Sequence, residues 1–454
     1  MNDVSETPPP PPGGGAGLWA RARRRPRIML AAAILAVAAG VLAAVLSLVL
    51  PSGPPKGLVV SLDLPKGNAC GKKLVAFRRL PEIDRWAFPL DRTWHHTRPC
   101  LRDMLAAAEK QPPDAPIHAF LEDQVLFILS QKPVRFYHHG DGTQKSLRDV
   151  LTPDRDLDFG AFDRVVYVNR RDVAHNAMSH VGLMQSLFEA ARIYAVGPHP
   201  DPERAAAYQA LGQAVVAVAL DPVAELGLRT RLPCDLRDGL ACSWFHAVTN
   251  RNRDASDVGG TLNKNLQVIR DLNRGAIVMA GIQAAAPTPE RAALIAELEA
   301  ATAEGINQLV YSSGLAGPNH TPSLFDYLPR NAGGVPIPKA WLYYAINVPK
   351  AKGYYLRREY WKNCSYHVLD MNHLHFILKE GGHLTDTSGF REPAAMLGGK
   401  SILHFILDTY LDKLEGPDGL YKDTPTEPDG EYMGCKEGFK PPAPQFVVDF
   451  FRDY

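Results

Sequence analysis

The stretch that decides the fold is Met178-Ser-His-Val-Gly-Leu-Met-Gln-Ser-Leu-Phe-Glu-Ala-Ala-Arg-Ile-Tyr194. Its apolar side chains recur at intervals of three and four, which places them on one face of an α-helix. The same spacing returns in five later segments: 262–272, 294–309, 340–346, 368–378 and 401–411. Helices joined by Gly- and Pro-containing loops fit an α/α toroid or an irregular helical bundle. We expect a mainly α protein with an (α/α) toroid, because several loops are long and polar, as where inner helices open onto a cleft.

The composition of the chain changes on both sides of this helical region. Short apolar runs such as 134–137 and 165–168 are broken by Pro, Gly and Asp, which favours a small β-containing domain. A Pro- and Gly-rich tail cannot bury a core and is expected to be disordered. The predicted organisation is a tail over 1–27, a transmembrane helix over 28–50, a small mixed α/β domain over 51–168, the toroid over 169–412 and an extension over 413–454.

The segment Ile28 to Leu50 is apolar and uncharged, and five arginines precede it within Arg21 to Arg27. Its length of about 23 residues is enough to span a bilayer once, and the basic cluster favours a cytoplasmic N-terminus. A cleaved signal peptide is the alternative, but its apolar core is usually shorter. We therefore expect a single-pass inner-membrane protein with a periplasmic domain, and a Golgi type II protein would share this layout.

All six cysteines follow the apolar segment, where an oxidising compartment would allow disulfides to persist. Closure over short separations favours pairing Cys70 with Cys100 and Cys234 with Cys242, which leaves Cys364 for Cys435. The net charge of +1 argues against nucleic acid as a partner.

A first group of candidate residues lies in Asn363-Cys-Ser-Tyr-His-Val-Leu-Asp-Met-Asn-His-Leu-His375. On a helix, Tyr366, Asp370 and His373 are spaced by four and three and share one face. That face could present a phenol, a carboxylate and an imidazole to a ligand. An ordinary surface face with an Asp370 to His373 contact is the alternative.

A second group lies in the polar stretch Trp244 to Asp254. Arg251 and Arg253 could each bind a sugar carboxylate or sulfate through two hydrogen bonds. Asn250 and Asn252 could hydrogen-bond to hydroxyl groups, and Trp244 could stack on a sugar ring. A polar loop without any function is the alternative.

The sequence does not favour a metal or a cofactor. Adjacent side chains on a strand point to opposite faces, so the pairs His95-His96 and His138-His139 cannot chelate an ion there. Gly259-Gly260 lacks the spacing of a phosphate-binding loop, and no nucleophile elbow occurs. We therefore expect neither a metal site nor a cofactor.

Three short motifs, in the same order, resemble motifs of D-glucuronyl C5-epimerases. Tyr366-His367 with Asn372 and Leu374 resembles the family's Tyr-His-x-x-His-Ile-Asn-Gln-Leu helix. The other two are Gly260-Thr-Leu-Asn263 with Ile269-Arg-Asp-Leu272, similar to a Leu-Asn-Gly-Phe helix, and Ser323-Leu-Phe-Asp326, similar to a Thr-Ile-Tyr-Asp turn. The resemblance covers 260–378 and implies an α/α toroid after a β-containing domain, with a uronic-acid polysaccharide in a cleft.

The chain departs from this family at one position that bears on catalysis. The tyrosine of the family's Thr-Ile-Tyr-Asp turn takes part in proton transfer, whereas Phe325 stands there and cannot exchange a proton. Inversion at C5 needs two proton-handling groups on opposite faces of the sugar. Tyr366 is kept, and the candidates for its partner are His246, His320, Tyr311 and Tyr327.

The sequence therefore predicts action on a uronate-containing polysaccharide by C5 proton abstraction, as an epimerase or a lyase. Tyr366 would be a general acid/base, His246 the second proton carrier, and Arg251 or Arg253 the carboxylate clamp. The alternative is a non-catalytic glycan-binding or scaffold subunit of a polysaccharide synthesis and export complex. A glycoside hydrolase ranks third, because no carboxylate pair stands out. The membrane and a polysaccharide are the expected partners, and other assembly proteins or a second copy of the chain remain open.

Overall fold

The computed structural model describes residues 98–140, 142–168, 173–174, 177–250, 259–315, 317, 321–331, 333–338, 342–343, 345–347, 357–359, 363–414 and 445–454, with short stretches between 64 and 87. All of these residues belong to one compact unit, Ser61–Tyr454. The predicted domain boundaries inside this unit stay predictions.

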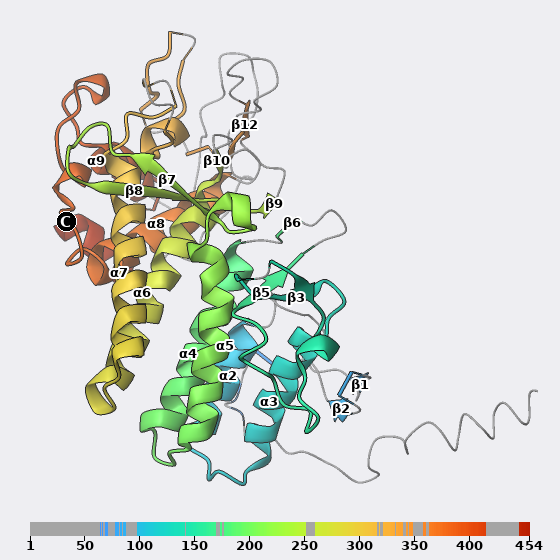
Figure 1. Ribbon diagram of the computed structural model, residues 1–454. Coiled ribbons are helices and arrows are strands. Elements are labelled where there is room, and N and C mark those ends of the chain that lie inside the picture. The colour runs from blue at the N-terminus through green and yellow to red at the C-terminus, as the bar shows by residue number, and fades with distance from the viewer. Residues whose placement is uncertain are drawn as a thin grey trace, which may run out of the picture. The chain divides into compact units, whose positions relative to one another are not determined.

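Helices make up most of the described residues. They are α2 (Arg98–Ala108), α3 (Pro116–Leu129), α4 (Ala177–Val196), α5 (Pro202–Leu220), α6 (Leu262–Ala285), α7 (Pro289–Val310), α8 (Asn363–Glu380), α9 (Ile402–Leu414) and α10 (Gln445–Asp453). Figure 1 shows α4, α5, α6 and α7 as long helices, and the most extensive pairings are α4 with α5, α4 with α6 and α6 with α7. Helix α8 packs on α6, and α9 and α10 pack on α8.

Local sequence explains where the long helices start and why they approach closely. Asp201 caps α5 by accepting from the Arg204 amide at 3.0 Å, and Thr288 caps α7 in the same way. A Cβ atom at Gly212 of α5 would lie 2.5 Å from the Phe188 ring of α4, and one at Gly275 of α6 would lie 2.8 Å from Met184 Sδ. Glycine at these two crossings lets α5 and α6 pack directly on α4.

The strands are short and form separate antiparallel sheets. The three-stranded sheets are β4 (Gln144–Lys145), β3 (Val134–Tyr137) and β5 (Arg164–Tyr167), and β10 (Gly259–Thr261), β11 (Ala345–Asn347) and β12 (Arg357–Glu359), each in that spatial order. The two-stranded pairs are β1 (Arg78–Leu80) with β2 (Arg85–Ala87), β6 (Val173–Ala174) with β9 (Thr249–Asn250), and β7 (Arg229–Pro233) with β8 (Ala241–Phe245). Strand β5 packs on α5, and β8 packs on α7.

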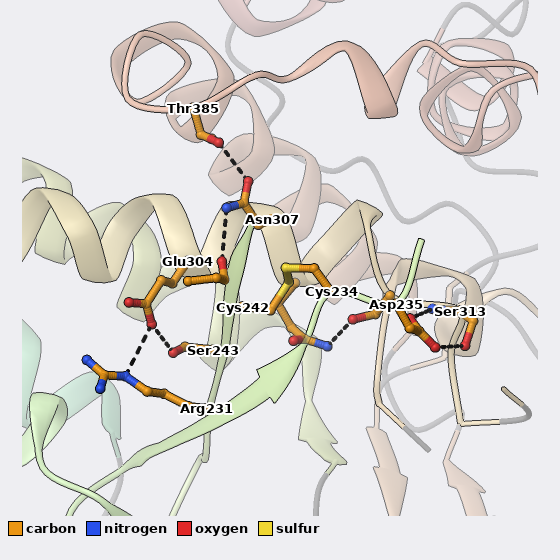
Figure 2. Close-up of a disulfide and its surroundings, with 12 residues drawn as sticks. Arg231, Cys234, Asp235, Cys242, Ser243, Glu304, Asn307, Ser313 and Thr385 are labelled. Carbon is orange, nitrogen blue, oxygen red and sulfur yellow. Dashed lines mark hydrogen bonds and ion pairs between the residues drawn. A yellow bond between two sulfur atoms is a disulfide. The ribbon is translucent and has the colours of Figure 1, made fainter. Parts of the chain in front are cut away.

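Two of the predicted disulfides are confirmed. Cys70 pairs with Cys100 at a Cα separation of 4.7 Å, and Cys234 pairs with Cys242 at 5.5 Å. The second bridge closes the turn of the β7–β8 hairpin (Figure 2). The predicted pairing of Cys364 with Cys435 lies outside the described residues.

The predicted fold class needs correction. An α/α toroid consists of helical hairpins that close into a double ring, whereas here the main helix pairings run from α5 through α4 and α6 to α7, and the β7–β8 hairpin interrupts the chain between α5 and α6. The apolar spacing identified the inward faces of α4, α6 and α7 but not the partners that cover them. It was wrong at 340–346, where the structure has strand β11 (Ala345–Asn347) instead of a helix. Of the helices that the structure describes, none is long and apolar enough to cross a membrane. The expected transmembrane segment, 28–50, lies outside the described residues.

Candidate functional site

The end of β8 carries two of the predicted site residues, and both are buried. Trp244 is 1% exposed and stacks on the ring of Tyr327, with the ring centroids 6.3 Å apart. His246 is fully buried, and a hydrogen bond of 2.7 Å joins its Nε2 to Thr230 Oγ1 on β7. In this structure the indole therefore has a protein ring rather than an open face beside it, which does not support its predicted contact with a sugar.

The predicted carboxylate clamp follows these residues along the chain. Asn250 ends β9, which pairs with β6. Arg251, Asn252 and Arg253 lie outside the described residues, and their roles stay predictions.

The predicted polar face of α8 lies inside the protein. Tyr366 belongs to the first turns of this helix, and its side chain is not among those described. One turn later, Asp370 is 2% exposed, and its Oδ1 has no hydrogen-bond partner within the described residues. Burial raises the pKa of this carboxyl well above its usual value, so the interior favours the neutral acid.

His373 connects the face of α8 to a charged pair on α6. Arg270 Nη1 donates to His373 Nδ1 at 2.9 Å, and the same guanidinium donates to Asp271 Oδ1 through Nε at 3.0 Å and Nη2 at 2.8 Å. Gln267 Nε2 donates to the other carboxylate oxygen, Oδ2, at 3.3 Å. Because a guanidinium can only donate, His373 Nδ1 accepts, and a neutral ring carries its proton on Nε2. Arg270 therefore fixes the orientation of the imidazole.

Tyr327 joins the two predicted groups of residues. It ends the short helix η4 (Leu324–Tyr327), and its hydroxyl donates to the Gly260 carbonyl at 2.8 Å. Its pKa is raised well above the usual value, chiefly by burial and then by the charges of Asp326 and Asp370. The same ring stacks on Trp244, so Tyr327 packs against β8 and is hydrogen-bonded to β10, directly before α6.

The turn that resembles the epimerase motif explains how Tyr327 is placed. Asp326 Oδ2 accepts from the Ser323 amide at 2.8 Å, and its Oδ1 accepts from the Leu315 amide at 2.9 Å. This capping box holds η4 in position. The buried phenol of this turn is thus that of Tyr327, the residue after Asp326, whereas the family's tyrosine stands at the position of Phe325.

Further buried polar groups lie at the start of α6. Asn263 and Asn265 are 4% and 2% exposed, and the side-chain oxygen of each has no hydrogen-bond partner in the part of the chain that the structure describes. Asn265 Nδ2 donates to the Phe245 carbonyl at 3.2 Å, which ties this turn to the end of β8. We refer to Asn263, Asn265, Asp370 and Tyr327 as the polar layer. Buried polar atoms normally find partners, and each exception calls for an explanation.

The other candidates for a second proton carrier differ in their surroundings. The Tyr311 hydroxyl accepts from Arg237 Nη1 at 2.6 Å and from the Gly389 amide at 3.1 Å, beside the disulfide-closed hairpin. Through these bonds Tyr311 connects the loop after Cys234 with the loop after α8, which is a structural role. His320 lies outside the described residues.

One group of described side chains has metal-ligand spacing. Single ligand atoms of His139, Asp221 and Glu225 all lie within 4.8 Å of one another. Asp221 already accepts from Arg164 Nε at 2.6 Å through Oδ2 and from Nη2 at 3.2 Å through Oδ1. The charge of this guanidinium opposes a cation there, so we assign no metal site to the group.

An open pocket of about 430 Å³ lies between α5 and α7. Its lining includes Arg164, Asp221, Glu290 and Glu297 but none of the described candidate residues. The polar layer is therefore an interior feature and does not line this pocket.

The sequence contained a signal for the α6 side of the site. Asn263, Gln267 and Arg270 follow one another at spacings of four and three, and Asp271 lies four residues after Gln267, next to the apolar stripe of the same helix. A polar stripe beside an apolar one on a helix that is buried on several sides points to an internal polar contact. For Tyr327 the signal was the family resemblance, which placed a proton-handling residue in this turn.

Comparisons with protein-family models, with curated proteins and with solved structures find no match to this chain.

Proposed function

We propose that the protein acts on a uronate-containing polysaccharide by removing the proton at C5, as an epimerase or a lyase. The observation that carries the proposal is Asp370, a buried carboxyl whose Oδ1 has no hydrogen-bond partner among the described residues and whose pKa burial raises well above its usual value. Groups whose pKa is strongly shifted by burial gather at catalytic sites. The substrate class comes from the resemblance of 366–374 to the epimerase helix.

The chemistry assigns a separate task to each group. Removing the C5 proton leaves an electron pair that delocalises onto the sugar carboxylate as an enediolate, and a neutral carboxyl can donate a hydrogen bond to that developing charge. Asp370 would supply this hydrogen bond. Tyr366, one helical turn before it, would carry protons. His246 is bonded to Thr230 and Tyr327 to the Gly260 carbonyl, so neither of these buried side chains is assigned the second proton transfer.

The two disulfides support a location in an oxidising compartment outside the cytoplasm. Such a compartment also contains the uronate polymers of cell surfaces and secreted matrices. The proposed location and the proposed substrate are therefore compatible.

A non-catalytic glycan-binding or scaffold subunit is the second candidate. The burial of Trp244 and His246 favours it, because both side chains serve the interior in this structure. On this interpretation the polar layer would be a structural feature of the core.

The test is incubation with a glucuronate-containing polymer in deuterated water. An epimerase places deuterium at C5, and a lyase produces an unsaturated uronate that absorbs in the near ultraviolet. Tyr366→Phe should lower the rate by on the order of 10² to 10⁴, the usual contribution of a general acid or base. Asp370→Ala, which removes the proposed hydrogen-bond donor, should lower it by roughly 10² to 10³.

Tyr410→Phe is the matched control. The Tyr410 hydroxyl is buried without a hydrogen-bond partner among the described residues, so its removal should leave the rate unchanged. Polymer binding without exchange or cleavage would favour the scaffold. Full activity in both site variants would overturn the assignment of Tyr366 and Asp370.

A further inference from the structure

The C-terminal helix α10 covers a buried histidine of α8. Phe446, Phe450 and Phe451 of α10 place their ring centroids 5.4, 4.6 and 6.2 Å from that of His375, all in edge-to-face geometry. Phe376 of α8 adds a fourth ring at 4.9 Å. His375 is 1% exposed, and neither ring nitrogen has a hydrogen-bond partner within the described residues.

The charges around His375 do not stabilise an imidazolium. Burial lowers the pKa of His375, Lys379 on the same helix lowers it further, and Glu380 opposes this in part. Glu380 is itself engaged by Arg274 of α6 at 3.3 Å. The charged side chains of α10 are exposed and partly paired, since Arg452 lies 3.5 Å from Asp449.

Among the described contacts, the elements that pack behind α10 bring no negative charge that would stabilise a protonated His375. Tyr410 of α9, a neutral phenol, lies 6.1 Å from Phe451, measured between ring centroids. Arg391 stacks on Tyr454 at 3.8 Å, after the end of α10. Asp408 of α9 is half-buried and forms an ion pair with Lys400.

Helix α10 is short and relies on packing against its neighbours. It has nine residues, and an isolated helix of that length is marginal in water. Its buried side chains are Val447, Val448 and Phe451. Of these three, Phe451 also belongs to the ring cage around His375, so a charge on His375 would weaken part of the contact that docks the helix.

We propose that α10 is an acid-released latch, which stays docked on α8 while His375 is neutral and undocks when His375 takes up a proton. The proposal does not depend on the proposed enzymatic function. Because α8 also carries Asp370 and His373, release would uncover one side of the helix that bears the candidate site.

The direction of the pH dependence follows from the lowered pKa. With α10 docked, the pKa of His375 lies below its ordinary value of 6.5, and with α10 released the solvated ring returns toward that value. The released state therefore binds the proton more tightly. The equilibrium constant for docking of α10 does not change with pH above pH 6.5. Below pH 6.5 it falls by up to about tenfold per pH unit, until the pKa of His375 in the docked state is reached.

Hydrogen exchange of the amides of 445–453 tests the proposal, with rates corrected for intrinsic exchange between about pH 5 and pH 7.5. Protection of these amides should fall by up to about tenfold per pH unit below 6.5, while amides of α4 keep theirs. His375→Phe should abolish the pH dependence, and His404→Gln, which changes an exposed histidine of α9, should keep it.

Protection of α10 that does not change with pH in the wild type would overturn the latch. The same would follow if His375→Phe kept the wild-type pH dependence. A titration of the His375 ring protons by NMR in the wild type provides a measurement that needs no variant. A midpoint at or above 6.5 contradicts the proposal, and a lower one that coincides with the loss of protection supports it.

Discussion

Two buried polar regions of this protein differ in how completely their hydrogen bonds are satisfied. At the β7–β8 hairpin, Glu304 of α7 binds Arg229 and Ser243, and Asn307 donates to the Ala241 carbonyl and accepts from Thr385. Figure 2 shows the bonds of Glu304 to Ser243 and of Asn307 to Thr385. In the polar layer, side-chain oxygens of Asn263, Asn265 and Asp370 have no partner among the described residues. The first region is built as a structural joint, and the second keeps polar groups that a folding requirement alone does not explain.

The hairpin shows what a fully bonded joint looks like in this chain. Asp235, next to the disulfide, accepts from the Ser313 amide at 2.8 Å and from its hydroxyl (Figure 2). Arg237 binds Asp386 at 2.6 Å. The hairpin is thus fastened to α7, to the loop after α7 and to the loop after α8. Unsatisfied groups are costly in such an interior, which makes the polar layer the better candidate for a functional site.

The largest expected effect on stability is at Glu304. Removing one partner of a buried ion pair leaves an uncompensated charge, so Glu304→Gln should lower the free energy of unfolding by roughly 3 to 5 kcal/mol. Chemical denaturation measures this change. Glu297→Gln on the exposed face of the same helix should change stability by less than about 0.5 kcal/mol, and equal effects in the two variants would show that the Arg229–Glu304 pair is not a joint.

The disulfide of the same hairpin should contribute less to the free energy of unfolding than the Arg229–Glu304 pair. Cys234 and Cys242 are eight residues apart, and a loop of that size is expected to stabilise the fold by about 2.5 kcal/mol through the entropy of the unfolded chain. The double variant Cys234→Ser, Cys242→Ser should show this loss in thermal unfolding, measured under non-reducing conditions so that the Cys70–Cys100 bridge stays intact. A loss near zero would mean that the α7 contacts alone hold the hairpin.

The smallest expected change in stability gives the sharpest contrast between the β7–β8 hairpin and the polar layer. Asn263 and Asn307 are both 4% exposed, but only Asn307 has both ends bonded. Asn307→Leu should destabilise the fold by roughly 1 to 3 kcal/mol, because it leaves Thr385 and the Ala241 carbonyl without this partner. Asn263→Leu should be nearly neutral in the same denaturation experiment. A larger loss for Asn263→Leu would place the polar layer among the structural joints.

Sequence reasoning identified the helices better than their arrangement. The stretch 178–194 lies within α4, and the apolar stripes of α6 and α7 face the core as expected. The toroid was wrong because periodicity says which face of a helix is apolar and not which neighbour covers it. The two confirmed disulfides were predictable because short loops close most readily.

The candidate site was only partly predictable. Spacing placed Asp370 and His373 on one face of a helix, but it could not show that this face is buried or that Arg270 reaches His373 from α6. Trp244 was expected to face a ligand because a polar stretch follows it. Its contact with Tyr327 links residues that are far apart in the sequence, and no local pattern encodes such a contact.

The central claim is that Asp370 is a buried acid favoured in its neutral form, and the pH dependence of unfolding tests it most directly. A folded-state pKa raised above the usual 3.8 means that the folded state binds the proton more tightly than the unfolded state. The wild type should therefore lose stability relative to Asp370→Asn as the pH rises above 3.8, by up to about 1.4 kcal/mol per pH unit until the folded-state pKa is reached. Parallel stability curves for the two proteins across this range would show that Asp370 ionises normally and would contradict the account.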